Sequence, residues 1–187
     1  GGHGGRSDRD GANATSPAFG VGLSVQPCEG QERLSPVLTT KHEIITDSAG
    51  PGKFRGGCGV EKGGILTEMD NTVMSYCCDR SRSITWGIFG GLPSYPHGAW
   101  LNPGKEGEQF LGTIFSNIKV NKGDSFPRPS AGGGGLGDPL ERDPAKVAFD
   151  VEAGLVTREG ARRYGVVLND DFTVDVAATA ELRRKMA

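Results

Sequence analysis

Short apolar runs separated by glycine-rich turns make up residues 1–124, and such runs predict β-strands. The run at 34–46 is rich in β-branched residues, and Pro36 within it places this strand at the edge of a sheet. The other predicted strands lie at 21–27, 59–70, 71–79, 83–91 and, as a pair that turns near Asn117, at 109–120. Strands with turn signals at this spacing favour a sandwich- or barrel-like β assembly.

The pattern changes near residue 125, where a connector rich in proline and glycine leads into helical spacing. Asp143 followed by Pro144 predicts an N-cap with proline at the first helical position, and Gly154 predicts the end of that helix. The elements predicted after it are a short helix from Thr157 to a stop at Gly165, strands at 166–168 and 172–176, and a charged helix at 179–187.

These elements define an α+β fold class with two parts. Residues 1–124 form a glycine-rich, mainly antiparallel β domain, and residues 125–187 form a Gly/Pro connector with a short helical C-terminal tail. Glycine accounts for 31 of 187 residues, about 17%, against an average near 7%. The excess has no G-X-Y period, which excludes collagen, and it predicts many tight turns between short strands.

The charge and hydropathy of the chain exclude several classes of protein. Lysine and arginine total 21 and aspartate and glutamate total 23, for a net charge of −2, so no nucleic-acid or membrane-surface partner is indicated. No apolar run approaches the roughly 18 residues that a membrane span needs, and no signal peptide is visible. We therefore expect a cytoplasmic protein.

The cysteines and histidines do not have metal-ligand spacing. The four cysteines (Cys28, Cys58, Cys77 and Cys78) form no C-x-x-C pair, and the three histidines stand far apart. We expect reduced thiols and no metal site contained within this chain.

Two glycine-rich blocks contain the candidate site residues. In the block at 48–57, glycines flank Lys53 and Arg55, so backbone N–H groups and two cations are able to surround an anion. The alternative, which we favour, is a hairpin whose glycines adopt positive φ and whose cations are solvated. The second block, Gly132–Gly135 followed by Asp138, predicts either a loop that lines a ligand site or a flexible linker.

A third block, at 77–82, predicts an ion-pairing face at an interface between subunits. The aromatic residues that follow it are Trp86, Phe89, Tyr95 and Trp100. They are able to form a pocket wall or an interface anchor, but packing in the core is the favoured interpretation. No Gly-x-Ser-x-Gly elbow, H-E-x-x-H helix or paired-carboxylate constellation is present in the sequence.

Three ordered blocks resemble the hydantoinase B/oxoprolinase family. DSAGPGKFRGGCG, at 47–59, resembles the family's D-S-G-G-x-G-x-x-R-G-G-x-G segment. GGGGLGDPLERDPAKVAFDVEAGLVTREGARRYGVVL, at 132–168, resembles its C-terminal signature, and GGHGGRSDRDGANA, at 1–14, resembles the G-G-x-G-A-x-x-x-x-D-G element that precedes both. The family includes N-methylhydantoinase B, the second half of 5-oxoprolinase and the large subunits of acetone and acetophenone carboxylases.

The resemblance implies part of an ATP-dependent complex. A hydantoinase A-type subunit would bind ATP, a divalent metal (Mg, Mn or Zn) would assist, and a phosphorylated intermediate would react at a shared site. Family B-type chains are several times longer and carry His/Asp-rich metal motifs that have no counterpart here, and this sequence begins without methionine. We therefore expect the C-terminal part of a B-type subunit, inactive by itself and partnered by the remainder of that subunit and by a small-molecule substrate.

Within this resemblance, Arg55 and Asp138 are the candidate catalytic residues, and Gly132, Gly133, Gly134 and Gly135 are the candidate cofactor-binding residues. They would approach the shared active site or the main interface of a cyclic-amide hydrolase (hydantoinase, oxoprolinase or lactamase) or of a ketone carboxylase. The alternative is a non-catalytic structural module for assembly of such a complex.

Overall fold

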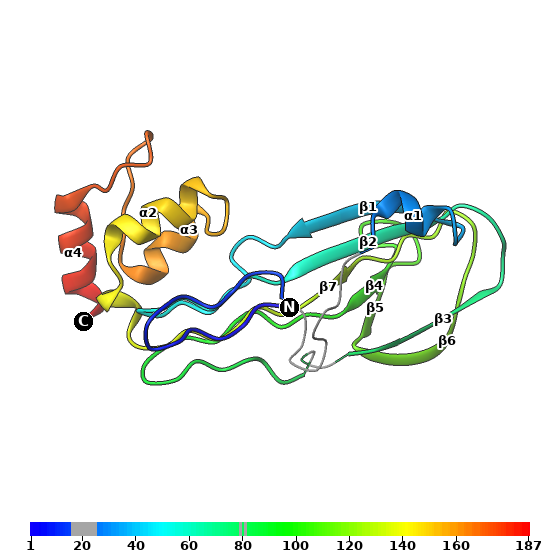
Figure 1. Cartoon of the computed structure of the whole chain (residues 1–187), viewed down its shortest axis with the longest axis horizontal. Helices are drawn as coiled ribbons and strands as arrows, with labels where there is room; N and C mark the ends of the chain where they lie inside the picture. Colours follow the sequence, from blue (N-terminus) through cyan, green and yellow to red (C-terminus); the bar gives the residue numbers. More distant parts are fainter. Residues whose placement is uncertain (16–25, 79, 81) are drawn as a thin grey trace.

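A computed structural model describes residues 1–15, 26–78, 80 and 82–187. The molecule is elongated, with small sheets at one end, the C-terminal helices at the other and extended glycine-rich segments between them (Figure 1). Most of the strand predicted at 21–27 lies outside the described residues. No helix in the described part of the chain is long and apolar enough to cross a membrane.

The described strands form three small antiparallel sheets. The larger sheet contains β1 (Val37–Ile44), β2 (Val60–Leu66) and β7 (Arg128–Pro129) in that order; β3 (Thr72–Cys77) pairs with β6 (Ile114–Val120), and β4 (Ala99–Leu101) with β5 (Gln109–Gly112). A short helix, α1 (Cys28–Glu32), precedes β1. The edge position predicted for the Pro36 strand is confirmed. The described strands form three small sheets and not the predicted sandwich or barrel. The α+β class with mainly antiparallel strands is confirmed.

The turn predicted near Asn117 and the strand predicted at 83–91 are both wrong. β5 and β6 meet at Thr113 and belong to different sheets, while Asn117 lies inside β6 with φ +58°, where the β3–β6 register shifts. Segment 83–91 has no regular strand partner, because its backbone packs against the glycine tract and Ile88 makes only an isolated bridge to Leu136.

Five segments without regular strand pairing form a structure that we call the glycine bundle: residues 1–5, 10–14, 48–59, 86–92 and 130–137. Backbone hydrogen bonds connect them. The Gly133 N–H donates to the Gly57 carbonyl at 2.8 Å, and the Gly57 N–H donates to the His3 carbonyl at 2.7 Å. The Gly50 N–H donates to the Gly133 carbonyl at 2.8 Å, so one glycine of the tract connects segments distant in sequence.

The glycines of the bundle are required because the neighbouring backbone leaves no space for a side chain. A Cβ built on Gly56 would lie 1.9 Å from the Gly133 carbonyl oxygen, and one built on Gly135 would lie 1.9 Å from the Pro51 carbonyl oxygen. Neither residue has φ in the left-handed region. The predicted hairpin with positive φ is therefore wrong, and so is the flexible linker predicted at Gly132–Gly135, because that tract is buried and hydrogen bonded.

The helical region, residues 138–187, agrees closely with its local sequence signals. It contains the 3-10 turns η1 (Pro139–Glu141) and η2 (Arg162–Tyr164) and the helices α2 (Pro144–Glu152), α3 (Arg158–Ala161) and α4 (Val176–Met186). The Asp143 carboxylate accepts from the Ala145 N–H at 2.9 Å, and the Thr157 hydroxyl accepts from the Gly160 N–H at 2.8 Å, so both predicted caps are confirmed. The predicted terminal strand pair is reduced to one bridge, between Leu168 and Val174.

Side chains fill the interior of the helical region. Its buried members are Val147, Val151, Val156, Ala161, Tyr164 and Val166. A second apolar core, formed by Leu66, Leu101, Val120 and Phe126, lies among the sheets. The division at residue 124 remains a prediction; β7 pairs with β2 and residues 130–137 belong to the bundle, so the C-terminal helical structure begins only at Pro139.

Candidate functional site

A largely buried network of four charged side chains lies where the bundle meets the helical region. Arg142 binds Asp10 with two hydrogen bonds, from Nη1 to Oδ1 and from Nη2 to Oδ2, each 2.7 Å long. Arg142 Nη2 also donates to Asp150 Oδ2 at 2.7 Å, and Arg55 Nε lies 3.2 Å from the same oxygen. The network therefore joins all three sequence blocks that resemble the hydantoinase B/oxoprolinase family.

Local structure places each member of this network. Asp150 lies on the same face of α2 as Val147 and Val151, since the spacings of three and four residues bring side chains to one side of a helix. The backbone N–H of Arg55 donates to Asp10 Oδ1 at 2.8 Å, which holds the first segment against the second.

Asn13 extends the network into the bundle. Its side-chain oxygen accepts from Arg55 Nη1 at 3.2 Å and from the Cys58 N–H at 2.8 Å. Arg55 Nη1 also donates to the Gly56 carbonyl at 2.5 Å. Nη1 of Arg55 is therefore engaged by groups of this chain, whereas Nε faces Asp150 as an ion pair and makes no hydrogen bond.

The network is largely buried and electrically balanced. Arg142 is 1% exposed and Arg55 and Asp150 are each 3% exposed, whereas the Asp10 side chain is 30% exposed. Two arginines face two aspartates. Burial alone would raise the pKa of Asp10, but hydrogen bonds from Arg142 and Arg55 and their charges outweigh it and lower that pKa. Burial opposes the charge of Arg142, yet its bonds to the two aspartates raise its pKa, so the Asp10–Arg142 pair stays charged at neutral pH.

Two buried groups beside the network are unsuited to act as nucleophile or acid at neutral pH. Burial raises the pKa of the Cys58 thiol, although the charge of Arg55 partly opposes this, and the thiol lies 3.6 Å from the Leu155 carbonyl, to which it donates. Burial also raises the pKa of Tyr164 above its ordinary value. Both groups stay protonated, so they contribute packing and hydrogen bonds.

A hollow of about 590 Å³ lies over the network. Its lining residues are Asp10, Gly11, Asn13, Arg55, Arg142, Ala145, Lys146, Phe149, Asp150 and Leu155. Phe149, on the outer side of α2, is exposed at this hollow.

The sequence-predicted site residues do not lie in one place. Arg55 belongs to the buried network, whereas Asp138 is exposed and caps η1, accepting from the Leu140 N–H at 2.8 Å. The glycine tract is the buried centre of the bundle, and the N–H groups of Gly133 and Gly135 already donate to the carbonyls of Gly57 and Leu92. These two N–H groups are therefore engaged and do not face a free anion.

Sequence analysis missed Asp10, Arg142 and Asp150 as a unit. All three stand inside the family blocks, but Asp10 and Arg142 are 132 residues apart, so no spacing rule connects them. The one available signal was their occurrence in those separate blocks. Arginine and aspartate in such blocks are candidates for mutual pairing.

The aromatic residues at 86–95 are not in the core, contrary to the favoured interpretation. Trp86 is 67% exposed and Phe89 is 85% exposed, and Tyr95 is exposed as well. Trp100 is partly buried against Phe110, at 4.9 Å between ring centroids. The ion-pairing face predicted at 77–82 includes Asp79, which lies outside the described residues.

Within residues 1–15, 26–78, 80 and 82–187, no group of three histidine, cysteine or carboxylate side chains is arranged to hold a metal ion. His97 Nδ1 lies 2.7 Å from the Pro129 carbonyl oxygen, and His42 Nδ1 lies 3.6 Å from Cys28 Sγ. The described residues therefore do not fit the divalent metal that the family resemblance implies.

The sequence profile of the family described as hydantoinase B/oxoprolinase matches residues 1–139, and the chain belongs to this family. It is 29% identical over 187 residues to a putative B-type subunit of a D-/L-hydantoinase from Pseudomonas sp. (strain NS671), covering 98% of this chain and 31% of that protein.

Two solved structures are similar to this fold. An ATP-dependent caprolactamase from Pseudomonas jessenii matches with a TM-score of 0.83 and 31% identity, over 98% of this chain and 32% of the other. A nucleotide-free structure of ATP-dependent acetone carboxylase matches with a TM-score of 0.80 and 24% identity, over 96% and 28%, and shares the fold. The chain thus spans about a third of the length of its relatives.

Proposed function

We propose that this chain is the C-terminal, scaffolding part of a B-type subunit in an ATP-dependent complex that hydrolyses a cyclic amide or carboxylates a ketone. The observation that carries the proposal is the convergence of the three family blocks on one charge-balanced network. Caprolactamase and acetone carboxylase, whose chains contain this fold, are both ATP-dependent.

The state of the network supports a positioning role for Arg55. Its guanidinium faces Asp150, Asn13 and the Gly56 carbonyl, and it is almost fully buried. A substrate carboxylate or phosphate would have to reach an almost fully buried guanidinium and compete there with the Asp150 carboxylate. We therefore assign ATP, the divalent metal and the reacting groups to the hydantoinase A-type subunit and to the remainder of the B-type subunit.

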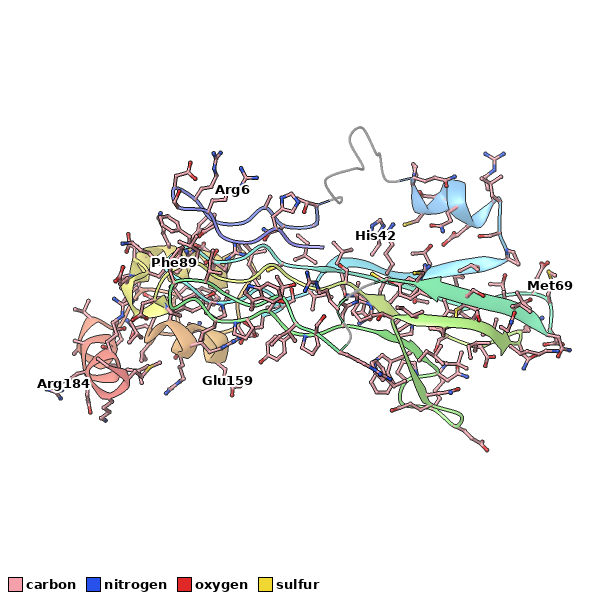
Figure 2. The ribbon with its side chains drawn as sticks, turned by 90° about the horizontal axis from the view of Figure 1, so that it is seen from below. Arg6, His42, Met69, Phe89, Glu159 and Arg184 are labelled. Atoms are coloured by element: carbon pink, nitrogen blue, oxygen red, sulfur yellow. The ribbon has the colours of Figure 1, made fainter. Side chains whose placement is uncertain are left out.

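A direct contribution to the shared active site is the second candidate, and the position of Asp138 favours it. This carboxylate is exposed at the end of the bundle, where Lys53 and Glu141 form an exposed ion pair of 3.0 Å. The exposed Phe89 lies at the same end (Figure 2). These exposed charged groups would be accessible to an active site assembled from several polypeptides.

The first experiment purifies the tagged chain from its own cells and identifies what accompanies it. We expect an ATP-binding companion and B-type polypeptide carrying His/Asp motifs. We also expect ATP-dependent turnover of a lactam or hydantoin, or ATP-dependent carboxylation of a ketone, in the assembly and none in the isolated chain. Turnover by the isolated chain, or purification without companions, would contradict the proposal.

The second experiment separates the two candidates with Asp138→Asn. Asparagine is as good an N-cap as aspartate, so this variant keeps the cap of η1 and removes the charge. A scaffold role predicts unchanged kcat and unchanged assembly. A role in the shared site predicts that kcat falls at least about tenfold, which corresponds to ~1.4 kcal/mol, while assembly is retained.

A further inference from the structure

Large exposed apolar side chains are concentrated in residues 84–95, a stretch that includes the bundle segment 86–92. We call this group the apolar strip, and it contains Ile84, Trp86, Ile88, Phe89, Leu92 and Tyr95. Single exposed apolar residues are ordinary on protein surfaces, but a concentration of large ones on one segment favours a contact with another protein surface. The strip therefore calls for an explanation.

The strip faces outward because of how the bundle is built. The Ile88 N–H donates to the Gly135 carbonyl at 3.1 Å, and the Gly137 N–H donates to the Ile88 carbonyl at 3.0 Å. The inner side of this segment is thus occupied by backbone, and a Cβ built on Gly91 would lie 2.2 Å from the Gly135 carbonyl oxygen. Apolar side chains of such a segment become buried only if another surface covers them from outside.

Phe89 adopts an unfavourable backbone conformation, and burial of its side chain does not offset the cost. The Gly91 N–H donates to the Ile88 carbonyl at 3.0 Å, with φ +52° at Phe89 and φ +90° at Gly90. A turn with positive φ at both central residues prefers asparagine, aspartate or glycine, and a bulky residue there costs about 1–2 kcal/mol. The Phe89 side chain remains 85% exposed, so its burial does not offset this cost.

Two arginines stand over aromatic rings of the strip. The Arg80 guanidinium carbon lies 5.6 Å from the Trp86 ring centroid, and that of Arg163 lies 5.4 Å from the Tyr95 ring centroid. Tryptophan, tyrosine and arginine are the residues most enriched at the energetic centres of protein interfaces. A complementary surface would carry apolar side chains flanked by carboxylates.

We infer that the apolar strip is the surface on which the rest of the B-type subunit packs; this inference rests on the proposed function. The same fold occupies only 32% of the caprolactamase chain and 28% of the acetone carboxylase chain, so about two thirds of each chain lies outside it. Permanent contacts are more hydrophobic than transient ones. An uncharged row of six large apolar residues therefore fits polypeptide of the same subunit better than a separate A-type subunit.

The test compares the isolated chain with the native assembly purified by a tag on this chain. Hydroxyl-radical oxidation should be at least about fivefold slower at Trp86, Phe89 and Tyr95 in the assembly, because contact excludes water from a covered side chain. Met69, which is exposed at the opposite end of the molecule (Figure 2), serves as the reference. Equal oxidation of the three aromatic residues in both samples would overturn the inference.

The occupant is identified by a photoreactive benzoylphenylalanine in place of Phe89. We expect it to crosslink to hydantoinase B-type sequence outside residues 1–187. A crosslink to an A-type subunit, to a second copy of this chain, or to nothing would overturn the inference. If the assembly and its ATP-dependent activity are present while the strip stays reactive, the inference fails and the proposed function stands; if no B-type polypeptide accompanies the chain, both fail.

A matched pair of variants gives an independent readout. Phe89→Asp should lower the amount of copurifying B-type polypeptide at least about tenfold, as truncation of an interface centre does. The isolated variant should remain as stable as the wild type, since aspartate tolerates positive φ. Leu34→Asp, at a residue that is 80% exposed outside the strip, should leave assembly unchanged. Unchanged assembly of Phe89→Asp would also overturn the inference.

Discussion

The glycine bundle and the helical region are stabilised in opposite ways. In the bundle, backbone packs against backbone, and the approach of Gly56 to Gly133 leaves no room for even one methyl group. In the helical region, side chains such as Val147 and Tyr164 fill the interior and side-chain caps begin the helices. Substitutions that add an atom should therefore destabilise the bundle, whereas substitutions that remove atoms should destabilise the helical region.

Gly56→Ala should have the largest effect. Its Cβ would lie 1.9 Å from the Gly133 carbonyl oxygen and 2.5 Å from the carbonyl carbon, and backbone is unable to move aside as a flexible side chain does. We expect the free energy of unfolding to fall by more than about 4 kcal/mol. Urea unfolding followed by tryptophan fluorescence measures it.

Gly30→Ala is the matched control for this substitution. Gly30 lies in α1, where the nearest atom to a built Cβ is the end of the Gln26 side chain at 3.4 Å. Alanine is favoured over glycine in a helix, so stability should rise by up to about 1 kcal/mol. If both variants lost the same stability, the glycines of the bundle would be required for chain flexibility and not for the close approach of neighbouring backbone.

Asp150→Asn tests the joint between the two regions. The substitution removes the charge that faces both Arg55 and Arg142 and leaves two buried arginines incompletely paired. We expect a loss of about 3 kcal/mol, within the range for breaking a buried ion pair. Glu181→Gln, in the exposed pair with Lys185, should cost less than about 0.5 kcal/mol. Similar effects of the two substitutions would show that the buried network does not hold the regions together.

Val147→Ala should have an intermediate effect. Val147 is fully buried in the helical core, so the substitution removes apolar contacts and leaves a small cavity. We expect a loss of about 2 kcal/mol in urea unfolding. Val176→Ala removes the same atoms from an exposed position in α4 and should change stability by less than about 0.5 kcal/mol. A negligible effect at Val147 would contradict the assignment of this cluster as the core.

The smallest expected effect concerns the pH dependence of the Asp10–Arg142 pair. The folded-state pKa of Asp10 is lowered, so its contribution is fully present above the unfolded-state pKa, near 3.9, and is lost as pH falls through the lower folded-state value. The difference in unfolding free energy between wild type and Asp10→Asn should therefore be constant from pH 7 to about 5 and shrink below about 4. Urea unfolding at stepped pH measures it, and a difference that grows on acidification would contradict the sign.

The two regions also differ in how far the sequence predicted them. Asp143, Thr157 and Gly165 predicted the helix ends correctly, because a cap interacts with residues two to four positions away. Glycine predicted turns in the bundle, and this was wrong for Gly56 and Gly133, whose neighbours come from distant segments. Because glycine has no side chain, its presence in the sequence does not indicate which backbone segment will pack against it.

The candidate site shows the same limit. The catalytic role of Arg55 stays a prediction, and its partners Asp150 and Asn13 stand on other segments, so its pairing was not visible in the sequence. The exposure of Phe89 was missed for a related reason. Aromatic residues are usually buried, and only the packed backbone on the inner side of its segment turns this one outward.

The sequence by itself determined the family, the α+β class and the helix starts at Asp143 and Thr157, since these depend on motif order and on contacts within a few residues. Only the tertiary structure decided that the glycine-rich segments form a backbone-packed bundle, and that Arg142 meets Asp10 from 132 residues away. The physical reason is that close backbone packing and buried ion pairing are formed by groups far apart in the chain, and local patterns do not encode which of them meet.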